Sequence, residues 1–182
     1  VKVVLLGSPY LYYLLYTYDP EFAELFKVKV DFSDHMPRTP ENALALARVL
    51  ATCCREEGLR PFDRGGVAKL VEQSSRMVED QERLSTSFAE ILDVAREASF
   101  WAESHGHARV GTEDVAAAVR ARIYRSNRIE ELLQDLILQG TLLIGTQGAA
   151  VGQVNGIAVI PLGDYLFGKP SRITARTFLG RG

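Results

Sequence analysis

Residues 61–106 read PFDRGGVAKLVEQSSRMVEDQERLSTSFAEILDVAREASFWAESHG, and their apolar positions recur with the period of an α-helix. Ser87 and Glu90 fit a capping box that opens a helix, and Gly106 is suited to end it. An earlier helix in the same stretch has an inward face with i, i+3 and i+4 spacing. Its members are Val67, Leu70, Val71, Ser74 and Val78.

Helical patterns extend on both sides of this stretch. Thr39 is followed by a proline, which predicts the start of a helix that Gly58 ends. Thr112 is expected to cap a fourth helix, whose pattern continues to about Gln139. Residues 36–140 are therefore predicted to form a four-helix domain, and the fold class is mainly α with short flanking β-strands.

The first 35 residues have the character of an α/β unit. Residues 1–6 (VKVVLL) form a β-branched apolar run that predicts a buried strand. Residues 27–32 (KVKVDF) alternate charged and apolar side chains, which is typical of a half-buried strand. Short helices are expected over residues 10–18 and 21–26. Residues 1–35 therefore read as the C-terminal strands of an α/β core.

The C-terminal part changes to β character. Residues 141–160 predict a strand, a glycine-containing turn and a second strand. Residues 152–178 look like the opening strands of a further domain, so residues 141–182 form a third, truncated region. Since both ends cut through predicted elements, we expect the chain to be a fragment of a larger protein.

Bulk properties fit a soluble globular chain. The 182 residues are 47% hydrophobic and 24% charged, with a formal net charge of −2. This charge gives no global attraction to nucleic acid, and no apolar run approaches the roughly 20 residues that span a bilayer. Cys53 and Cys54 are adjacent, so they are poorly placed to pair or to share a metal. We expect buried thiols in a cytoplasmic protein without membrane contact.

Three segments together resemble Lon-like proteases, in which an AAA+ ATPase is joined to a Ser-Lys protease. Residues 1–32, VKVVLLGSPYLYYLLYTYDPEFAELFKVKVDF, resemble the last two strands of the ATPase core. Residues 61–106 resemble the helical lid. Residues 151–177, VGQVNGIAVIPLGDYLFGKPSRITART, look like the linker and first strands of the protease domain. The chain is most similar to the bacterial Lon-related group.

The resemblance implies a parent that is an ATP-dependent serine endopeptidase, a hexameric ring that binds ATP and Mg²⁺ and degrades protein substrates. This chain lacks the G-x-x-x-x-G-K-[ST] loop and a Walker B strand, and the family's Ser-Lys dyad would lie beyond residue 182. No catalytic residue, and no cofactor for the isolated chain, is therefore expected. We expect this chain to act as a lid that senses nucleotide and couples the ATPase to the protease ring. The alternative is a non-enzymatic helical module that binds a partner or DNA.

Three residues are nucleotide-site candidates. The resemblance places Arg76 as a sensor-2 arginine, because a guanidinium binds phosphate oxygens in a bidentate manner. The alternative is a helix-surface ion pair with Glu72 or Asp80, at i−4 and i+4. The resemblance makes Ser8 a sensor-1 candidate, although it also suits a helix N-cap. Lys27 is the cation nearest to the position of the family's trans-acting arginine finger, or else an exposed strand residue.

Three further groups of polar or aromatic residues could also have a function. Arg122, Arg125 and Arg128 are spaced to line one helix face and could contact DNA phosphates or a neighbouring subunit. The alternative is a solvated face balanced by nearby acidic residues. His105 and His107 with Asp114 lack a further ligand at sensible spacing, so no metal site is expected. The tyrosines of residues 10–18 are expected to pack between the core and its neighbour.

Overall fold

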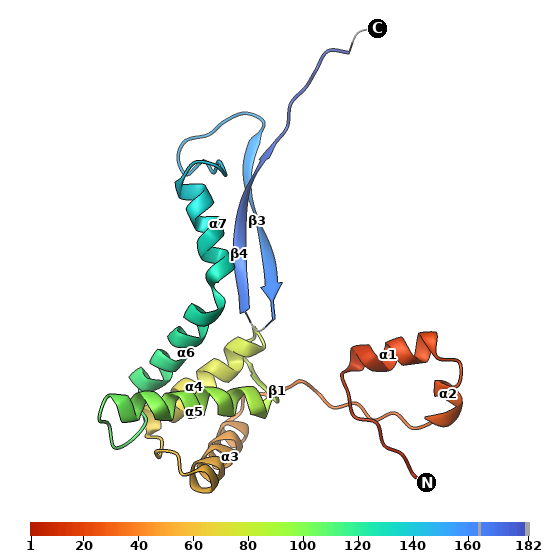
Figure 1. Ribbon diagram of the computed structural model, residues 1–182, viewed down its shortest axis with the longest axis vertical. Helices are drawn as coiled ribbons and strands as arrows, with labels where there is room; N and C mark the ends of the chain where they lie inside the picture. The colour runs from red at the N-terminus through yellow and green to blue at the C-terminus, as the bar shows by residue number, and fades with distance from the viewer. Residues whose placement is uncertain (164, 181–182) are drawn as a thin grey trace.

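The computed structural model describes residues 1–163 and 165–180, and it is mainly helical, as predicted (Figure 1). Helices α3 to α6 form a compact bundle, α7 continues upward from α6, and α1 and α2 lie apart to one side. In chain order the elements are α1 (Pro9–Tyr18), α2 (Phe22–Leu25), β1 (His35–Pro37), α3 (Pro40–Glu57), α4 (Arg64–Met77), β2 (Arg83–Ser85), α5 (Phe88–Ser104), α6 (Thr112–Ser126), α7 (Arg128–Leu138), β3 (Gln153–Leu162) and β4 (Tyr165–Thr174).

The hydrophobic core lies between α3, α4, α5 and α6, with β2 closing one side. Burial of these apolar side chains is the main force that holds the bundle together. Several core positions on α5 and α6 are alanines, which lets the two helices approach closely. The buried cluster comprises Leu46, Leu50, Cys54, Leu70, Val71, Leu84, Ile91, Val94, Ala95, Ala98, Ala102, Val110, Val115 and Ala118.

The predicted helix boundaries are confirmed where local capping chemistry sets them. The Thr39 hydroxyl accepts a hydrogen bond from the backbone N–H of Asn42 at 3.2 Å, which caps α3. Gly58 ends α3 in the left-handed conformation, with φ of 68°. The predicted capping box at Ser87 is wrong. Ser87 is the N-cap of α5, but the Ser87 side chain accepts no capping hydrogen bond.

The fourth helix is not a single helix to Gln139. It bends at Asn127, whose ψ of 7° separates α6 from α7. The bend lets α7 lie along the β3–β4 hairpin, where the Tyr165 hydroxyl donates a hydrogen bond to Glu130 and the pKa of Tyr165 is raised to about 12. The predicted Thr112 cap is also wrong, because Gly111 is the N-cap and Asp114 closes the turn.

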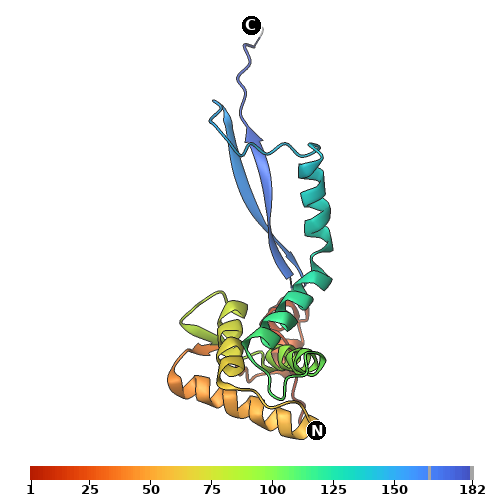
Figure 2. The ribbon, with the colours of Figure 1, turned by 90° about the vertical axis from the view of Figure 1, so that its left-hand side faces the viewer.

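The strand predictions succeed only in part. Residues 1–6 and 27–32 form no strand and are exposed, because no described segment pairs with them. In the third region, residues 141–148 are not a strand either. The strands there are β3 and β4, an antiparallel hairpin in register from Gln153 with Thr174 to Leu162 with Tyr165. Figures 1 and 2 both show this hairpin running beside α7.

The aromatic residues of α1 pack within their own lobe. The Tyr12 ring meets buried Phe22 of α2 edge-on, with ring centroids 5.6 Å apart. The Lys29 ammonium lies over Tyr12 and Tyr13, at 4.6 and 4.7 Å from the ring centroids. The other tyrosines of α1 are largely exposed, so the predicted packing against a neighbour stays a prediction. Among the described residues, no helix is long and apolar enough to cross a membrane.

The two cysteines are buried free thiols, as predicted. Burial raises the pKa of both thiols. A thiol kept protonated is a poor nucleophile and a poor metal ligand. Cys53 and Cys54 are therefore packing residues of α3.

An ion pair joins the end of α3 to α5, and it is expected to make the stability of the fold sensitive to acid. Glu57 accepts two hydrogen bonds from the Arg96 guanidinium, both at 2.7 Å, and a third from the Cys53 thiol. Arg96, and then Cys53, lower the pKa of Glu57 from 4.5 to about 2. Since the carboxylate form is favoured in the folded state, its stabilising contribution is complete above about pH 4.5 and lost as the pH falls to about 2.

Glu57→Gln should therefore flatten the loss of thermal stability between pH 4.5 and 2 relative to the unmodified chain. Melting temperatures followed by circular dichroism across this range measure the effect. Glu56→Gln, at the neighbouring exposed position, is the matched control and should keep the original acid dependence. Identical acid profiles for the unmodified chain and Glu57→Gln would exclude the pair as the cause.

Candidate functional site

Arg76 lies in the last turn of α4 and points away from the core. The two serines before it, Ser74 and Ser75, are buried on the opposite side of the helix. The Arg76 side chain is 68% exposed, and its Nε and Nη2 donate hydrogen bonds to Glu72 Oε1 at 2.9 and 2.8 Å. The helix therefore presents a guanidinium that is held in place but open to solvent.

A second cation shares the same carboxylate. Lys69 Nζ donates to Glu72 Oε2 at 2.8 Å, so Lys69, Glu72 and Arg76 form one polar row on α4, called here the α4 row. Lys69, and then Arg76, lower the pKa of Glu72. Two cations against one carboxylate leave the row with a net positive charge. This is the sign required for an anion such as a nucleotide phosphate.

Of the two acidic partners considered for Arg76, the structure selects Glu72. Asp80 instead contacts Arg83, with Oδ2 and Nε 3.2 Å apart. The i+4 pair needs a continuous helix, and α4 ends at Met77.

Ser8 and Lys27 are not brought next to Arg76. The Ser8 hydroxyl accepts a hydrogen bond from Leu11 N–H at 3.3 Å, which is the N-cap geometry of α1. Lys27 lies in the exposed segment 27–32 that pairs with no strand. Figure 1 shows α1 and α2 well separated from α4. The sensor-1 and finger roles of Ser8 and Lys27 therefore stay predictions.

The predicted basic stripe of Arg122, Arg125 and Arg128 is divided between two helices, and acidic residues pair with Arg125 and Arg128. Arg125 binds Glu97 of α5 at 2.6 Å, and Arg128 approaches Glu131 at 3.8 Å. The bend at Asn127 puts Arg128 on α7, whereas Arg122 and Arg125 belong to α6. This geometry favours a charge-balanced surface. DNA contact through these arginines stays a prediction.

The His105, His107 and Asp114 side chains converge where α5 passes into α6. The Nδ1 atoms of His105 and His107 lie 2.9 and 3.0 Å from Asp114 Oδ1. The Asp114 carboxylate is fully buried, and its Oδ2 accepts a hydrogen bond from Gly111 N–H at 3.0 Å. Burial works to raise the pKa of Asp114, but the Gly111 N–H and the two imidazoles together lower it. The ionised form of the Asp114 side chain is therefore favoured although the side chain is buried.

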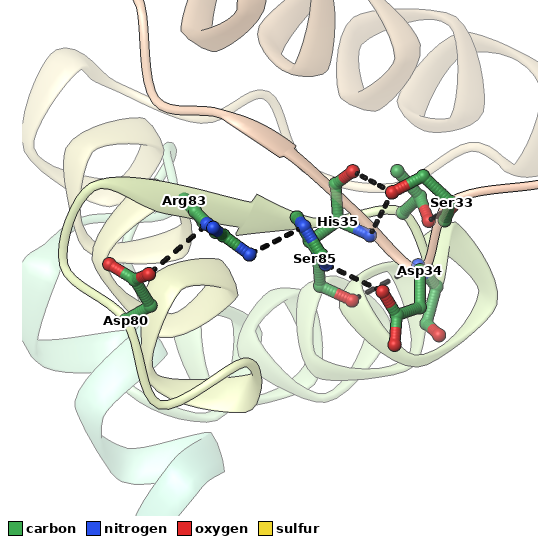
Figure 3. A network of polar contacts seen from close by, with 8 residues as sticks. Ser33, Asp34, His35, Asp80, Arg83 and Ser85 are labelled. Carbon is green, nitrogen blue, oxygen red and sulfur yellow. Dashed lines mark hydrogen bonds and ion pairs between the residues drawn. The ribbon is translucent and has the colours of Figure 1, made fainter.

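A further polar network was missed by the sequence analysis (Figure 3). Strand β1 pairs with β2 antiparallel, His35 opposite Ser85. The His35 ring lies between Asp34 and Arg83, with Nδ1 2.6 Å from Asp34 Oδ1 and Nε2 2.6 Å from Arg83 Nη1. Because a guanidinium only donates, Nε2 must accept, and Nδ1 carries the proton that goes to Asp34.

This network fixes the chain where residues 1–34 join the bundle. The Thr86 hydroxyl donates to the Ser33 carbonyl at 2.7 Å, and Thr86 N–H donates to the Asp34 carbonyl at 3.0 Å. Ser85 N–H donates to the buried Ser74 hydroxyl, which ties β2 to α4. Three-residue strands have no usable periodicity, so the sequence offered no signal for this network.

Comparison with known families agrees with this architecture. Residues 61–125 match the family described as "Archaeal LonB, AAA+ ATPase LID domain", which spans α4 to α6. Residues 1–33 match the family described as "LonB-like, AAA domain". The two matches cover the segments for which the sequence resemblance predicted a lid and an ATPase core.

Individual relatives give the same result. The chain is 33% identical over 141 residues to the Archaeal Lon protease of Archaeoglobus fulgidus, covering 75% of this chain and 22% of that protein. It is 29% identical over 136 residues to the Archaeal Lon protease of Methanothermobacter thermautotrophicus, covering 72% and 20%. An Escherichia coli (strain K12) protein named as a Lon protease homologue is 30% identical over 115 residues, covering 62% and 19%.

The chain thus spans about a fifth of the length of the curated relatives that it matches. The matched relatives are archaeal and bacterial, so the narrower bacterial grouping stays a prediction. Taken with the helical fold, these matches place the chain in the Lon-like family of AAA+ proteins, with a LonB-type lid over residues 61–125.

Proposed function

We propose that this chain is the nucleotide-sensing lid of an ATP-dependent Lon-like serine protease, with Arg76 as the residue that reaches the nucleotide phosphates. The observation that carries the proposal is the exposed Arg76 guanidinium at the end of α4, inside the LonB-type lid. A guanidinium suits phosphate because its planar N–H groups match two oxygens at once.

The α4 row is suited to one part of nucleotide binding only. Arg76 and Lys69 would hold phosphate oxygens, and bound ATP would supply the hydrolysis that drives the machine. The chain has neither a P-loop motif nor a Walker B strand to hold Mg²⁺. Mg²⁺ coordination and hydrolysis are therefore assigned to other parts of the assembly, which we propose to be a hexameric, protein-degrading ring.

Coupling would run from the lid through α7 to the hairpin. Helix α6 packs on the bundle, and α7 follows it across the bend at Asn127. Glu130 of α7 is joined to Tyr165 of β4 by a hydrogen bond. A rotation of the lid would therefore displace the hairpin, which we assign to the start of a protease domain.

The ion pair between Arg76 and Glu72 makes the proposal sharply testable. In the full-length gene product, Arg76→Ala should weaken ATP binding by about tenfold, the loss expected for one charge-assisted contact. Glu72→Gln should strengthen ATP binding, because the guanidinium no longer has to leave a carboxylate. Titration with a fluorescent ATP analogue measures both affinities.

Arg64→Ala is the matched control, since Arg64 is an exposed arginine in the first turn of the same helix. It should leave nucleotide affinity unchanged. Equal affinity for the unmodified protein, Arg76→Ala and Glu72→Gln would reduce the α4 row to a surface ion pair, which contributes only about 0.3–0.5 kcal/mol to the helix.

A further inference from the structure

We propose that His105, His107 and Asp114 form a binding site for a single Zn²⁺ ion that fastens the end of α5 to the start of α6. The three residues each offer one ligand atom, and these atoms all lie within 4.8 Å of one another. The site uses residues 105–107 after α5 and Asp114 of α6, whereas the α4 row lies on α4, and it does not depend on the nucleotide-sensing proposal.

The local backbone explains why three residues from two helices converge. Residue His105 is the C-cap of α5, and Gly106 has a φ of 74°, a left-handed conformation that turns the chain sharply. The turn brings His107 back beside His105, with ring centroids 5.5 Å apart. Asp114, the third residue of α6, then faces both imidazoles from below the surface.

The distances suit a zinc ion after a small adjustment. Zinc binds imidazole nitrogen and carboxylate oxygen at about 2.0–2.2 Å, so neighbouring tetrahedral ligands lie about 3.3 Å apart. The two Nδ1 atoms lie 2.9 and 3.0 Å from Asp114 Oδ1. These two distances would need to lengthen by only a few tenths of an ångström to admit the ion, and the imidazole nitrogens already lie within 4.8 Å of each other.

The chemistry of the ligands also favours zinc over Mg²⁺. Two imidazoles and one carboxylate suit a borderline metal such as Zn²⁺, whereas Mg²⁺ prefers an all-oxygen set. Both histidine side chains are partly exposed, 41% for His105 and 50% for His107, so the ion can enter from solvent and keep water at its open position.

Supporting contacts would hold the ligands in place. Gly111 N–H donates to Asp114 Oδ2 and fixes the carboxylate orientation, while His107 Nδ1 lies 3.0 Å from both carboxylate oxygens. The Trp101 ring lies 5.7 Å from the His105 ring and covers one side of it.

The test is calorimetric titration of Zn²⁺ into the metal-stripped 182-residue chain at neutral pH. We expect one saturable site, at least tenfold weaker in His105→Ala and in His107→Ala. Zinc should raise the melting temperature of the unmodified chain and not that of His107→Ala. Both variants alter exposed side chains, which avoids unfolding the chain through buried Asp114.

His35→Ala is the matched control, because His35 is the third histidine and lies outside the site. It should retain full zinc affinity. Cobalt substitution should give visible d–d bands without a thiolate charge-transfer band, which separates this site from Cys53 and Cys54. The proposal is overturned by the absence of saturable binding up to millimolar zinc, by unchanged affinity in both histidine variants, or by loss of binding in His35→Ala.

Discussion

Leu84→Ala is expected to lower the free energy of unfolding by about 2–5 kcal/mol. Leu84 is the central residue of the three-residue strand β2, and its side chain is completely buried among core residues of the bundle. The backbone around it is held by the pairing with Met36 and by the Ser85 bond to Ser74. The neighbouring helices cannot collapse freely into the cavity, so the loss should lie well above the transfer cost of the missing methyl groups.

Urea denaturation followed by circular dichroism measures this change. Leu44→Ala is the matched control, because Leu44 is a leucine of α3 with 53% of its surface exposed. Its effect should stay within about 0.5 kcal/mol. A similar small loss in both variants would show that β2 does not belong to the cooperative core.

The helices could be predicted from the sequence because their signals are local. Thr39 and Gly58 lie within one turn of the helix ends that they set, and the apolar spacing of α4 reports its buried face directly. The strands needed partners far along the chain. Residues 1–6 have strong β propensity, yet they form no strand because no described segment pairs with them.

The small sheet of β1 and β2 could not be predicted from local sequence signals. Its two strands are separated by α3 and α4, and each is too short to show alternation. The bend at Asn127, in contrast, has a local signal. Residues 125–128 are Arg-Ser-Asn-Arg, so the apolar spacing breaks between Ile123 and Ile129, and α7 then packs against β4.

The site residues and their possible partners could be named from the sequence, but the choice between partners could not. Arg76 had acidic neighbours on both sides, and the end of α4 at Met77 decided between them. From the sequence, His105, His107 and Asp114 lacked a further ligand at sensible spacing, so no metal was expected there. Their convergence on Asp114 depends on the left-handed turn at Gly106 and on the way α6 packs against α5.

Gly66→Ala is expected to destabilise the fold by about 2–3 kcal/mol, although alanine is the better helix former. Gly66 is buried in the first turn of α4, and an added Cβ would lie 2.4 Å from the Val110 carbonyl oxygen. That oxygen belongs to a backbone bridge, in which it accepts a hydrogen bond from Asp63 N–H at 3.0 Å. The clash is therefore with main chain that cannot move without breaking the contact between α4 and the start of α6.

Gly65→Ala provides the matched control one residue earlier in the same helix turn. Its Cβ would meet the Thr112 hydroxyl at 2.6 Å, a side-chain atom that can rotate away. The gain in helix propensity, up to about 1 kcal/mol, should then offset the crowding. Urea denaturation of the two variants should give opposite or clearly unequal changes. Equal changes would mean that the close approach of α4 to Val110 is not required, and that the lid tolerates a wider separation between α4 and α6.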